Sequence, residues 1–492
     1  MPALRAVLTA LAAAALAGCA RSLSVPQVAS YRPARPRGRP PAGSGGDPLA
    51  PFFGDLAAID AHAARRPVSI IQVGDSHSAG DFFSARLRDR FQARFGAAGR
   101  GLLPPGRPDR YYDPKLVRVT EAGWTRDSAR GGAGPIPFGI AGVTQTATGP
   151  ARMTLTSDEA EGFDRIEVVF RRLPQGGSFA VSVDGGAARM VSTRGADETV
   201  RATFEARRGS RTVTLETQGD GEVALLAWGT WRHVPGVLYQ NFGIIGAQVD
   251  VLGRYDAQSL ATELQDAALL VVEYGTNEAF GSAADLADYQ ERFRRDVAVL
   301  ADAAPQASVL IVGPPDVNRS AGAAGGGATL CTPDRLPQAT PEAAWPDGLV
   351  HDVALQTSRH AAAYAAAHGG AHHAARHGSA HGAARDGHAR GHAGRHAAHY
   401  ASVWARPAQV DMIAAAQHGV AGEQGWYFWD WSAAMGGPCA MVRWVGEHLG
   451  RGDHVHMTAA GYGDSADLLF DDLMHRYDAW RAPSATARPG RG

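Results

Sequence analysis

Apolar runs and helical repeats alternate along much of this chain. Four short runs rich in β-branched side chains predict strands at residues 68–73, 237–242, 268–272 and 308–312. Helical periodicity predicts helices at 55–64, 81–95 and 286–300. In the helix at 81–95, an apolar residue recurs every four positions at Phe83, Leu87, Phe91 and Phe95, which places all four on one face. This alternation predicts an α/β domain with a parallel sheet and helices on both of its faces.

The pattern changes between residues 107 and 235. Short runs with strand-like alternation lie at 163–170, 178–183, 199–204 and 211–217. Glycine-rich turns such as Gln175-Gly176-Gly177 separate them, and no helical repeat intervenes. Several short strands at near-regular spacing predict a β-sandwich inserted into the α/β domain. Its place in the chain leads us to expect that it helps to hold a polymeric substrate and contributes nothing to bond breaking; the alternative is that it only braces the α/β domain.

Two segments have compositions that predict disorder. Residues 20–50 are rich in Pro, Arg, Gly and Ser, which is typical of a tether. Residues 358–399 consist mainly of Ala, Gly, Arg and His and hold ten of the chain's 19 His residues. We interpret this segment as a disordered insertion, with a metal-collecting tract as the alternative. The predicted organisation is a signal peptide (1–19), a tether (20–50), an α/β domain in two parts (51–106 and 236–480), a sandwich (107–235), the insertion (358–399) and a tail (481–492).

The N-terminus has the pattern of a targeting segment. Arg5 precedes an apolar run at 6–16 that is too short to span a bilayer. The run ends in Leu16-Ala17-Gly18-Cys19, which resembles the lipobox of bacterial lipoproteins. That resemblance implies lipidation of Cys19 and, because Ala20 is not acidic, an anchor on the periplasmic side of the outer membrane. The alternative is an ordinary secretory signal with an incidental cysteine.

Charge and cysteine content bear on the partners that the protein could bind and on its possible disulfides. The formal net charge is -1, so no overall positive field would attract nucleic acid. Apart from Cys19, the chain has only Cys331 and Cys439. In an oxidising compartment these two could form a disulfide or remain as free thiols, and the sequence does not decide between them. No metal site or cofactor is predicted, and the oligomeric state is not predicted either.

The candidate chemistry begins where the first strand ends. The run Ile70-Ile71-Gln72-Val73 stops at Gly74-Asp75-Ser76-His77, so Ser76 would lie at the carboxyl end of a strand, where open α/β sheets place their sites. Near the other end of the chain, Asp453 and His456 are three residues apart, on a predicted loop before the last helix. Ser76 is therefore the candidate nucleophile, His456 the candidate base and Asp453 the acid that orients it.

Ester hydrolysis also requires hydrogen-bond donors for the oxyanion that forms on the carbonyl oxygen. Three groups are candidates: the backbone N–H of Ser76, the backbone N–H of Gly246 and the side-chain amide of Asn277. Gly246 follows the predicted strand at 237–242, and Asn277 follows the one at 268–272. Together with the serine, the base and the acid, these donors predict a serine esterase.

These segments resemble the four signature blocks of the SGNH/GDSL hydrolase superfamily, in the same order. Gly74-Asp75-Ser76 resembles the first block, with His77 in place of the usual Leu, and Gly246 resembles the glycine block. Gly275-Thr276-Asn277-Glu278 resembles the third block, with Glu in place of Asp, and Asp453 to His456 resembles the last. The resemblance covers most of residues 51–480. It implies a three-layer α/β/α fold and the site roles given above.

A finer resemblance is to the periplasmic peptidoglycan O-acetylesterases. That group shares Gly-Asp-Ser-His, a sandwich between the first two blocks, and the segment that runs here from Phe428 to Gly437. The resemblance implies removal of O-acetyl groups from a cell-envelope glycan. The alternatives are an O-acetyltransferase, a deacetylase of another polysaccharide and a non-catalytic glycan-binding lipoprotein. The insertion at 358–399 departs from the family pattern.

Other residues carry weaker signals. Gly463-Asp464-Ser465 repeats the serine motif without a preceding strand, and we interpret Ser465 as a solvated helix residue. His77 is interpreted as a supporting residue rather than a substrate contact, and His454 is not expected to bind a metal. Three tryptophans could form a sugar-stacking surface or belong to the sandwich core, and the core is favoured: Trp124, Trp228 and Trp231.

Overall fold

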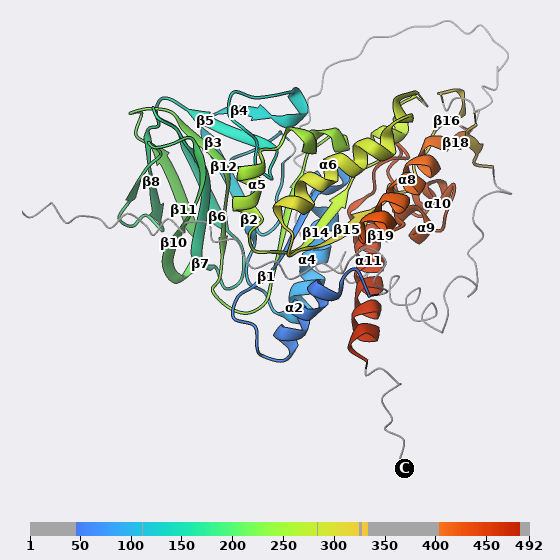
Figure 1. Ribbon diagram of the computed structural model, residues 1–492, viewed down its shortest axis with the longest axis horizontal. Helices are drawn as coiled ribbons and strands as arrows, with labels where there is room; N and C mark the ends of the chain where they lie inside the picture. The colour runs from blue at the N-terminus through green and yellow to red at the C-terminus, as the bar shows by residue number, and fades with distance from the viewer. Residues whose placement is uncertain (1–45, 111, 283, 324–326, 333–402, 483–492) are drawn as a thin grey trace, which may run out of the picture. The chain divides into compact units, whose positions relative to one another are not determined.

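The computed structural model describes residues 46–110, 112–282, 284–323, 327–332 and 403–482 (Figure 1). Four predicted segments lie wholly or largely outside these residues: the signal peptide with Cys19, the tether 20–50, the insertion 358–399 and the tail 481–492. The chain divides into two compact units. Unit 1 takes its described residues from Met1–Asp81, Phe91–Val272 and Arg294–Val309, and unit 2 from Phe82–Arg90, Glu273–Phe293 and Leu310–Gly492.

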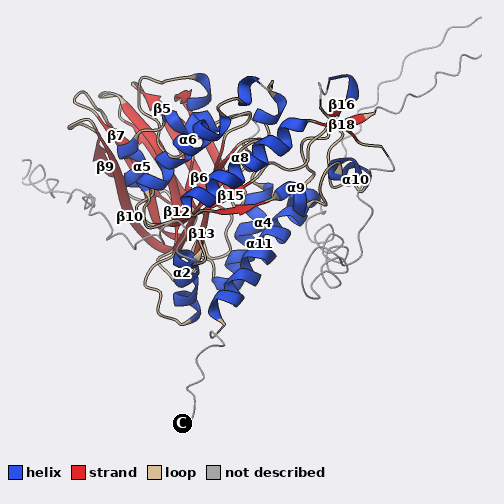
Figure 2. Ribbon diagram, turned by 45° about the vertical axis from the view of Figure 1, so that its right-hand side comes forward, coloured by secondary structure: helices blue, strands red, loops and turns tan. Residues whose placement is uncertain are grey.

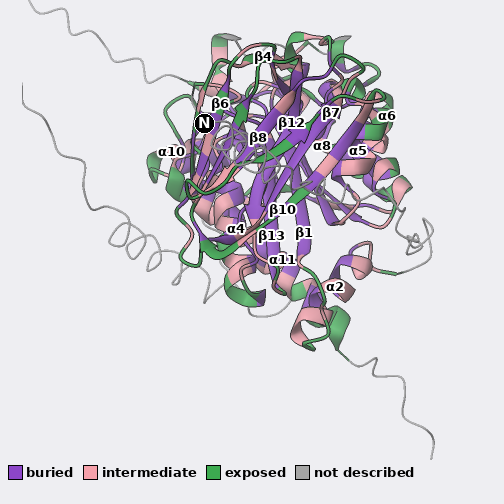
Figure 3. Cartoon of the chain, turned by 90° about the vertical axis from the view of Figure 1, so that its left-hand side faces the viewer, coloured by how far each residue is buried: buried purple, intermediate pink, exposed green. Residues whose placement is uncertain are grey.

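One five-stranded sheet contains the strands predicted for the α/β domain. Its hydrogen-bonded order is β13-β1-β14-β15-β19, with bounds Val237–Gly243, Val68–Gly74, Ala267–Glu273, Ser308–Val312 and Tyr427–Trp429. β1 pairs in parallel with β13, and β15 pairs in parallel with β19. β1, β14 and β15 are buried at every position, as expected of strands covered on both faces. Figure 3 shows the burial of β1. The predicted α/β fold with a parallel sheet is confirmed, and the four predicted strands begin and end within one residue of the observed ones.

The predicted helices are present, but the bounds of two of them differ from the predicted ones by three residues or more. The helix predicted at 81–95 is α4 (Phe82–Phe95), and its four regularly spaced apolar residues are all buried. The helix predicted at 286–300 is α6 (Tyr289–Ala303). The helix predicted at 55–64 is α2 (Ala50–Asp60), so its predicted start was wrong. Pro51 lies in its first turn, where a missing N–H costs no helical hydrogen bond, and Phe52 is buried.

Six further helices lie in the part of the chain that the structure describes. They are α3 (Ser76–Ala79), α5 (Ala257–Glu263), α8 (Ala408–Gln424), α9 (Trp431–Ala434), α10 (Ala440–Gly446) and α11 (Ala459–Arg481). Within the described residues, no helix combines the length and the apolar character needed to cross a membrane.

The segment predicted as a sandwich holds two antiparallel sheets, which we call the two-sheet module. One sheet has the order β10-β7-β12-β5-β4, with β2 also paired to β12, and the other has the order β3-β6-β11-β8-β9. Residues of both sheets, such as Leu155 and Trp228, share one apolar cluster. The strands are β2 (Gly101–Leu103), β3 (Val117–Ala122), β4 (Thr125–Ser128), β5 (Val143–Ala147), β6 (Arg152–Ser157), β7 (Phe163–Arg172), β8 (Ser178–Val183), β9 (Arg189–Ser192), β10 (Glu198–Ser210), β11 (Thr212–Thr217) and β12 (Val223–Trp231).

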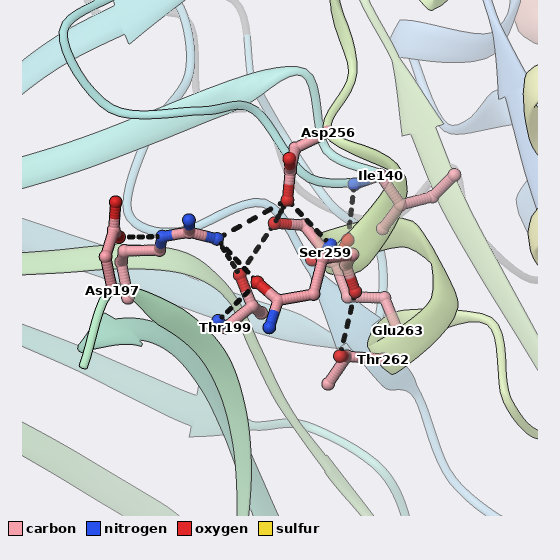
Figure 4. A network of polar contacts seen from close by, with 9 residues as sticks. Ile140, Asp197, Thr199, Asp256, Ser259, Thr262 and Glu263 are labelled. Atoms are coloured by element: carbon pink, nitrogen blue, oxygen red, sulfur yellow. Dashed lines mark hydrogen bonds and ion pairs between the residues drawn. The ribbon is translucent and has the colours of Figure 1, made fainter. Parts of the chain in front are cut away.

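Polar contacts join the two-sheet module to the α/β part of unit 1. α5 lies against β10 (Figure 2). Arg171 of β7 donates to Gln258 Oε1 (2.9 Å), and the Thr199 and Ser259 hydroxyls of β10 and α5 are 2.6 Å apart. Asp256, which caps α5, accepts from the amide of Ser259 in the same network (Figure 4). Because Arg171, Thr199 and Ser259 are buried, the contacts fix the module on α5 rather than leaving it on a flexible linker.

In unit 2, a small antiparallel sheet has the order β16-β18-β17, with bounds Arg319–Ser320, Trp404–Arg406 and Thr329–Leu330. Directly after β17, Cys331 forms a disulfide with Cys439, with 5.4 Å between their Cα atoms. The question that the sequence left open is thus answered in favour of pairing. The disulfide joins β17 to the start of α10.

Ser465 differs from its predicted environment. It lies in α11 as expected, but it is fully buried rather than solvated. Its hydroxyl accepts a hydrogen bond of 3.0 Å from the indole N–H of Trp431. The prediction of a solvated residue was therefore wrong, because the Trp431 indole needs a buried acceptor and Ser465 supplies it.

Candidate active site

The turn that carries Ser76 follows β1 directly. β1 ends at Gly74, and Asp75 caps the short helix α3 by accepting a hydrogen bond of 2.9 Å from the amide of His77. Asp75 and His77 are buried, whereas Ser76 between them is partly exposed. A strand followed at once by a capped helical turn therefore presents one accessible hydroxyl in an otherwise buried stretch.

A buried polar network supports this turn from β1 and β13. Gln72 donates to the Ser78 hydroxyl (2.6 Å) and accepts from the Tyr239 hydroxyl (2.8 Å). Asn241 donates to the Ser78 carbonyl (2.6 Å) and accepts from the amide of Gly243 (3.0 Å). The four side chains of this network are buried and hydrogen-bonded, so the network fixes α3 on β13. We did not single out Gln72 or Asn241 from the sequence, although polar residues inside apolar strands were an available signal.

Gly246 lies in a tight turn after β13, the parallel neighbour of β1. The amide of Ala247 donates to the carbonyl of Ile244 (3.1 Å), and Gly246 has φ +71°. The amide of Ile244 donates in turn to the carbonyl of Gly74 (2.9 Å). The serine and glycine turns thus follow adjacent parallel strands within unit 1.

Asn277 belongs to unit 2 and follows β14, which neighbours β1 in the sheet order. It is partly exposed, and Thr276 and Glu278 on either side are buried. Before it, Gly275 has φ +126°, and Gln417 of α8 donates to the carbonyl of Tyr274 (2.8 Å). The asparagine therefore shares the arrangement of Ser76, with one accessible polar group between buried neighbours.

Asp453 and His456 form a direct pair in unit 2. Asp453 Oδ2 lies 2.9 Å from His456 Nδ1, and Oδ1 accepts from the amides of Val455 and His456, both at 2.9 Å. Burial alone would raise the pKa of Asp453, but these hydrogen bonds outweigh it and lower the pKa below its usual value. Because a carboxylate only accepts hydrogen bonds, Nδ1 carries the proton and Nε2 is the basic nitrogen.

The loop that carries this pair is held on both sides. His454 is buried and stacks on Trp404 of β18, with 3.5 Å between ring centroids. The carbonyl of His454 accepts from the amide of Asn318 (2.9 Å), and Thr458 caps α11 just after the loop. Burial lowers the pKa of His454, partly opposed by the charge of Asp453. His454 thus has an evident packing role beside the pair.

The predicted site residues divide between the two units. Ser76 and Gly246 lie on neighbouring turns of unit 1, and Asn277 with the hydrogen-bonded Asp453 and His456 lies in unit 2. Within the described residues, no group of three or more His, Cys, Asp or Glu side chains has the geometry to hold a metal ion.

Comparison with solved structures finds a likeness that covers most of the chain. A peptidoglycan O-acetylesterase superposes with a TM-score of 0.62 and 23% sequence identity, over 88% of this chain and 98% of that one. Two family-two carbohydrate esterases give TM-scores of only 0.25 at 11% identity: one from Cellvibrio japonicus, over 75% of this chain and 100% of the other, and one from Corynascus thermopiles (Myceliophthora fergusii), over 77% and 100%. No protein-family model and no curated protein matches the sequence. The chain therefore shares the fold of the peptidoglycan O-acetylesterase.

Proposed function

We propose that this protein is a serine esterase that removes O-acetyl groups from a cell-envelope glycan, and that this glycan is peptidoglycan. The observation that carries the proposal is the hydrogen bond between Asp453 and His456, which holds an imidazole in the tautomer of a general base. Ser76, partly exposed at the end of β1, supplies the hydroxyl. The fold shared with a peptidoglycan O-acetylesterase supports the choice of substrate.

The proposed reaction has two steps. In the first, Ser76 Oγ attacks the acetyl carbonyl while His456 Nε2 takes its proton. The bond between the acetyl carbon and the sugar oxygen then breaks, and His456 gives the proton to that oxygen, which leaves as a hydroxyl. In the second, His456 Nε2 takes a proton from a water molecule that attacks the acetyl-serine, and returns it to Ser76 Oγ as the bond to the acetyl carbon breaks and acetate leaves. The backbone amides of Ser76 and Gly246 and the side-chain amide of Asn277 would stabilise the oxyanion in both steps. The lowered pKa of Asp453 keeps its carboxylate ionised beside the imidazolium that forms.

The proposal extends to architecture and location. The two-sheet module is interpreted as an inserted β-sandwich.

Lipidation of Cys19 would anchor the protein on the periplasmic side of the outer membrane. Incorporation of a labelled fatty acid that persists in Cys19→Ser would contradict the anchor.

The test of function is acetate release by the purified protein from O-acetylated peptidoglycan, with acetylated xylan and a small aryl acetate in parallel. We expect hydrolysis of the aryl acetate and faster turnover of peptidoglycan than of xylan. Faster turnover of xylan would overturn the choice of glycan. Transfer of the acetyl group to an added sugar, without free acetate, would identify a transferase instead. Absence of turnover of all three substrates would contradict an esterase.

A further inference from the structure

Arg130, a residue of unit 1, contacts the turn around Gly246. Arg130 lies in the short 3-10 turn η1 (Ala129–Gly131) between β4 and β5 of the two-sheet module. Its side chain is exposed, and Nε donates a hydrogen bond of 3.1 Å to the carbonyl of Gly246. The guanidinium also covers this glycine, because a Cβ built on Gly246 would lie 3.1 Å from both Nε and Nη2. The module therefore contributes a side chain directly to the glycine turn.

The turn that carries Arg130 is itself held in place. Ala129 is buried, and its amide donates to the carbonyl of Gly142 (2.8 Å). The carbonyl of Ala129 accepts from the guanidinium of Arg254, and the Ser128 hydroxyl accepts from the amide of Arg130 (3.4 Å). An exposed arginine loses conformational entropy when it binds a carbonyl. Because the backbone at Ala129 is fixed, only the side chain of Arg130 has to be ordered when it binds the carbonyl of Gly246.

The conformation of the turn around Gly246 explains why a hydrogen bond from Arg130 to its carbonyl would be useful. Ile244 to Ala247 form a four-residue turn with Gly246 at its third position, where φ is +71°. Ile245 is not among the residues with positive φ, so the turn is of the type II kind, which favours glycine at this position. The turn's own hydrogen bond uses the amide of Ala247, so the amide of Gly246 lies outside it. Glycine is conformationally permissive, and a bond to its carbonyl restricts the peptide.

We infer that Arg130 is a positioning residue for the oxyanion donor at Gly246. The inference rests on the proposed function, because it assigns a purpose to a residue only if the Gly246 amide stabilises an oxyanion. By fixing the carbonyl of Gly246, Arg130 keeps the turn in the conformation that presents the amide. The two-sheet module would then support the chemical step, contrary to the expectation from the sequence that it contributes nothing to bond breaking.

The test compares Arg130→Ala and Arg130→Lys with the wild-type protein on a small aryl acetate. Removing an oxyanion donor outright lowers kcat by about 10²- to 10³-fold, so losing its positioning should lower kcat by about 10- to 100-fold in Arg130→Ala, with KM unchanged. Arg130→Lys should keep part of the activity, because an ammonium can still donate to a carbonyl. Added guanidinium at millimolar concentration should restore part of the kcat of Arg130→Ala.

Arg126→Ala is the matched control. Arg126 is also an exposed arginine of the module, and its Nη1 donates to the carbonyl of Arg107 (3.3 Å) rather than to the glycine turn. We expect this variant to keep the wild-type kcat. An unchanged kcat in Arg130→Ala would overturn the inference. So would a rise in KM for polymeric glycan alone, which would mean a substrate contact, or a fall in Tm with no rescue, which would mean a structural role.

Ser76→Ala separates this inference from the proposed function. If the wild-type protein hydrolyses the ester and Ser76→Ala does not, an active Arg130→Ala contradicts only the role of Arg130. If Ser76→Ala hydrolyses the ester as fast as the wild-type protein, the proposed function fails and the role of Arg130 fails with it.

Discussion

Among single residues, Ser76 and Asn277 are distinguished by partial exposure inside a buried stretch. Ser76 and Asn277 each stand between buried neighbours. Nearby residues of the same two turns are held by other polar groups: Ser78 by Gln72 and Asn241, and Tyr274 by Gln417. A supported backbone with one accessible side chain is what a preorganised site requires, because less ordering remains to be done in the transition state.

Replacing Asp453 by Asn should separate the charge of this residue from its shape. The asparagine can keep the amide contacts, but it removes the ionised partner of His456 and favours the wrong imidazole tautomer. We expect kcat for an aryl acetate to fall by about 10³- to 10⁴-fold, with KM little changed. Asp113→Asn, which changes an exposed carboxylate paired with Lys115, is the control and should leave kcat unchanged. A fall of less than tenfold in Asp453→Asn would contradict the assigned role.

Glu263 of α5 gives a prediction for stability. Burial raises its pKa to about 8, despite a hydrogen bond from the amide of Ile140 (2.6 Å) and the charge of Arg201 (Figure 4 shows Glu263 and Ile140). Between its ordinary pKa of 4.5 and about 8, the unfolded chain loses this proton while the folded chain keeps it. The free energy of unfolding should therefore fall as the pH rises through this window.

Glu263→Gln has no such proton to lose and keeps an acceptor for Ile140. The Tm of Glu263→Gln minus the Tm of the wild-type protein should rise from pH 5 to pH 8. Each kcal/mol that the wild-type free energy of unfolding loses over this range corresponds to about 2 to 4 °C. The exposed Glu216→Gln is the matched control, with a constant Tm difference over the same range. A constant difference for Glu263→Gln as well would mean that the carboxyl is ionised in the folded protein.

At the scale of elements, the sequence predicted the strands well, because a short run of apolar residues largely determines where a buried strand lies. The four buried strands were predicted to within one residue, because few other structures bury a short β-branched run on both sides. Helix α2 began earlier than predicted, because its first turn is apolar around Pro51 and lacks the pattern of an exposed helix. Ser465 was misjudged because its partner, the Trp431 indole, is distant in sequence. Arg130 was missed for the same reason.

The disulfide is an element-scale feature with a measurable effect. Cys331 and Cys439 are 108 residues apart, and cross-linking a loop of about that length restricts the unfolded chain by about 4 to 5 kcal/mol in the chain-entropy model. We expect Cys331→Ser, Cys439→Ser or reduction with dithiothreitol to lower the Tm. Dithiothreitol should have no further effect on the double variant. Equal Tm values for the oxidised and reduced wild-type protein would contradict a stabilising disulfide.

At the scale of the whole molecule, the two-sheet module is more than an appended domain. Trp228 lies in its core, as favoured from the sequence, and Trp124 packs against that core. Trp231 is partly buried. The module's contacts with α5 and its Arg130 bond to Gly246 connect it to the α/β part of unit 1. The sequence could suggest where the module is inserted, but these contacts depend on residues that only the folded chain brings together.

The central claim is that the reaction passes through an acetyl group on Ser76. The most direct measurement mixes the purified protein with an aryl acetate, quenches in acid within the first turnovers and locates the acetyl group by peptide mass spectrometry. The proposed mechanism predicts acetylation at Ser76 and neither acetylation nor acetate release above background in a folded Ser76→Ala variant. Acetylation at another residue, or wild-type acetate release by the folded Ser76→Ala protein, would contradict it.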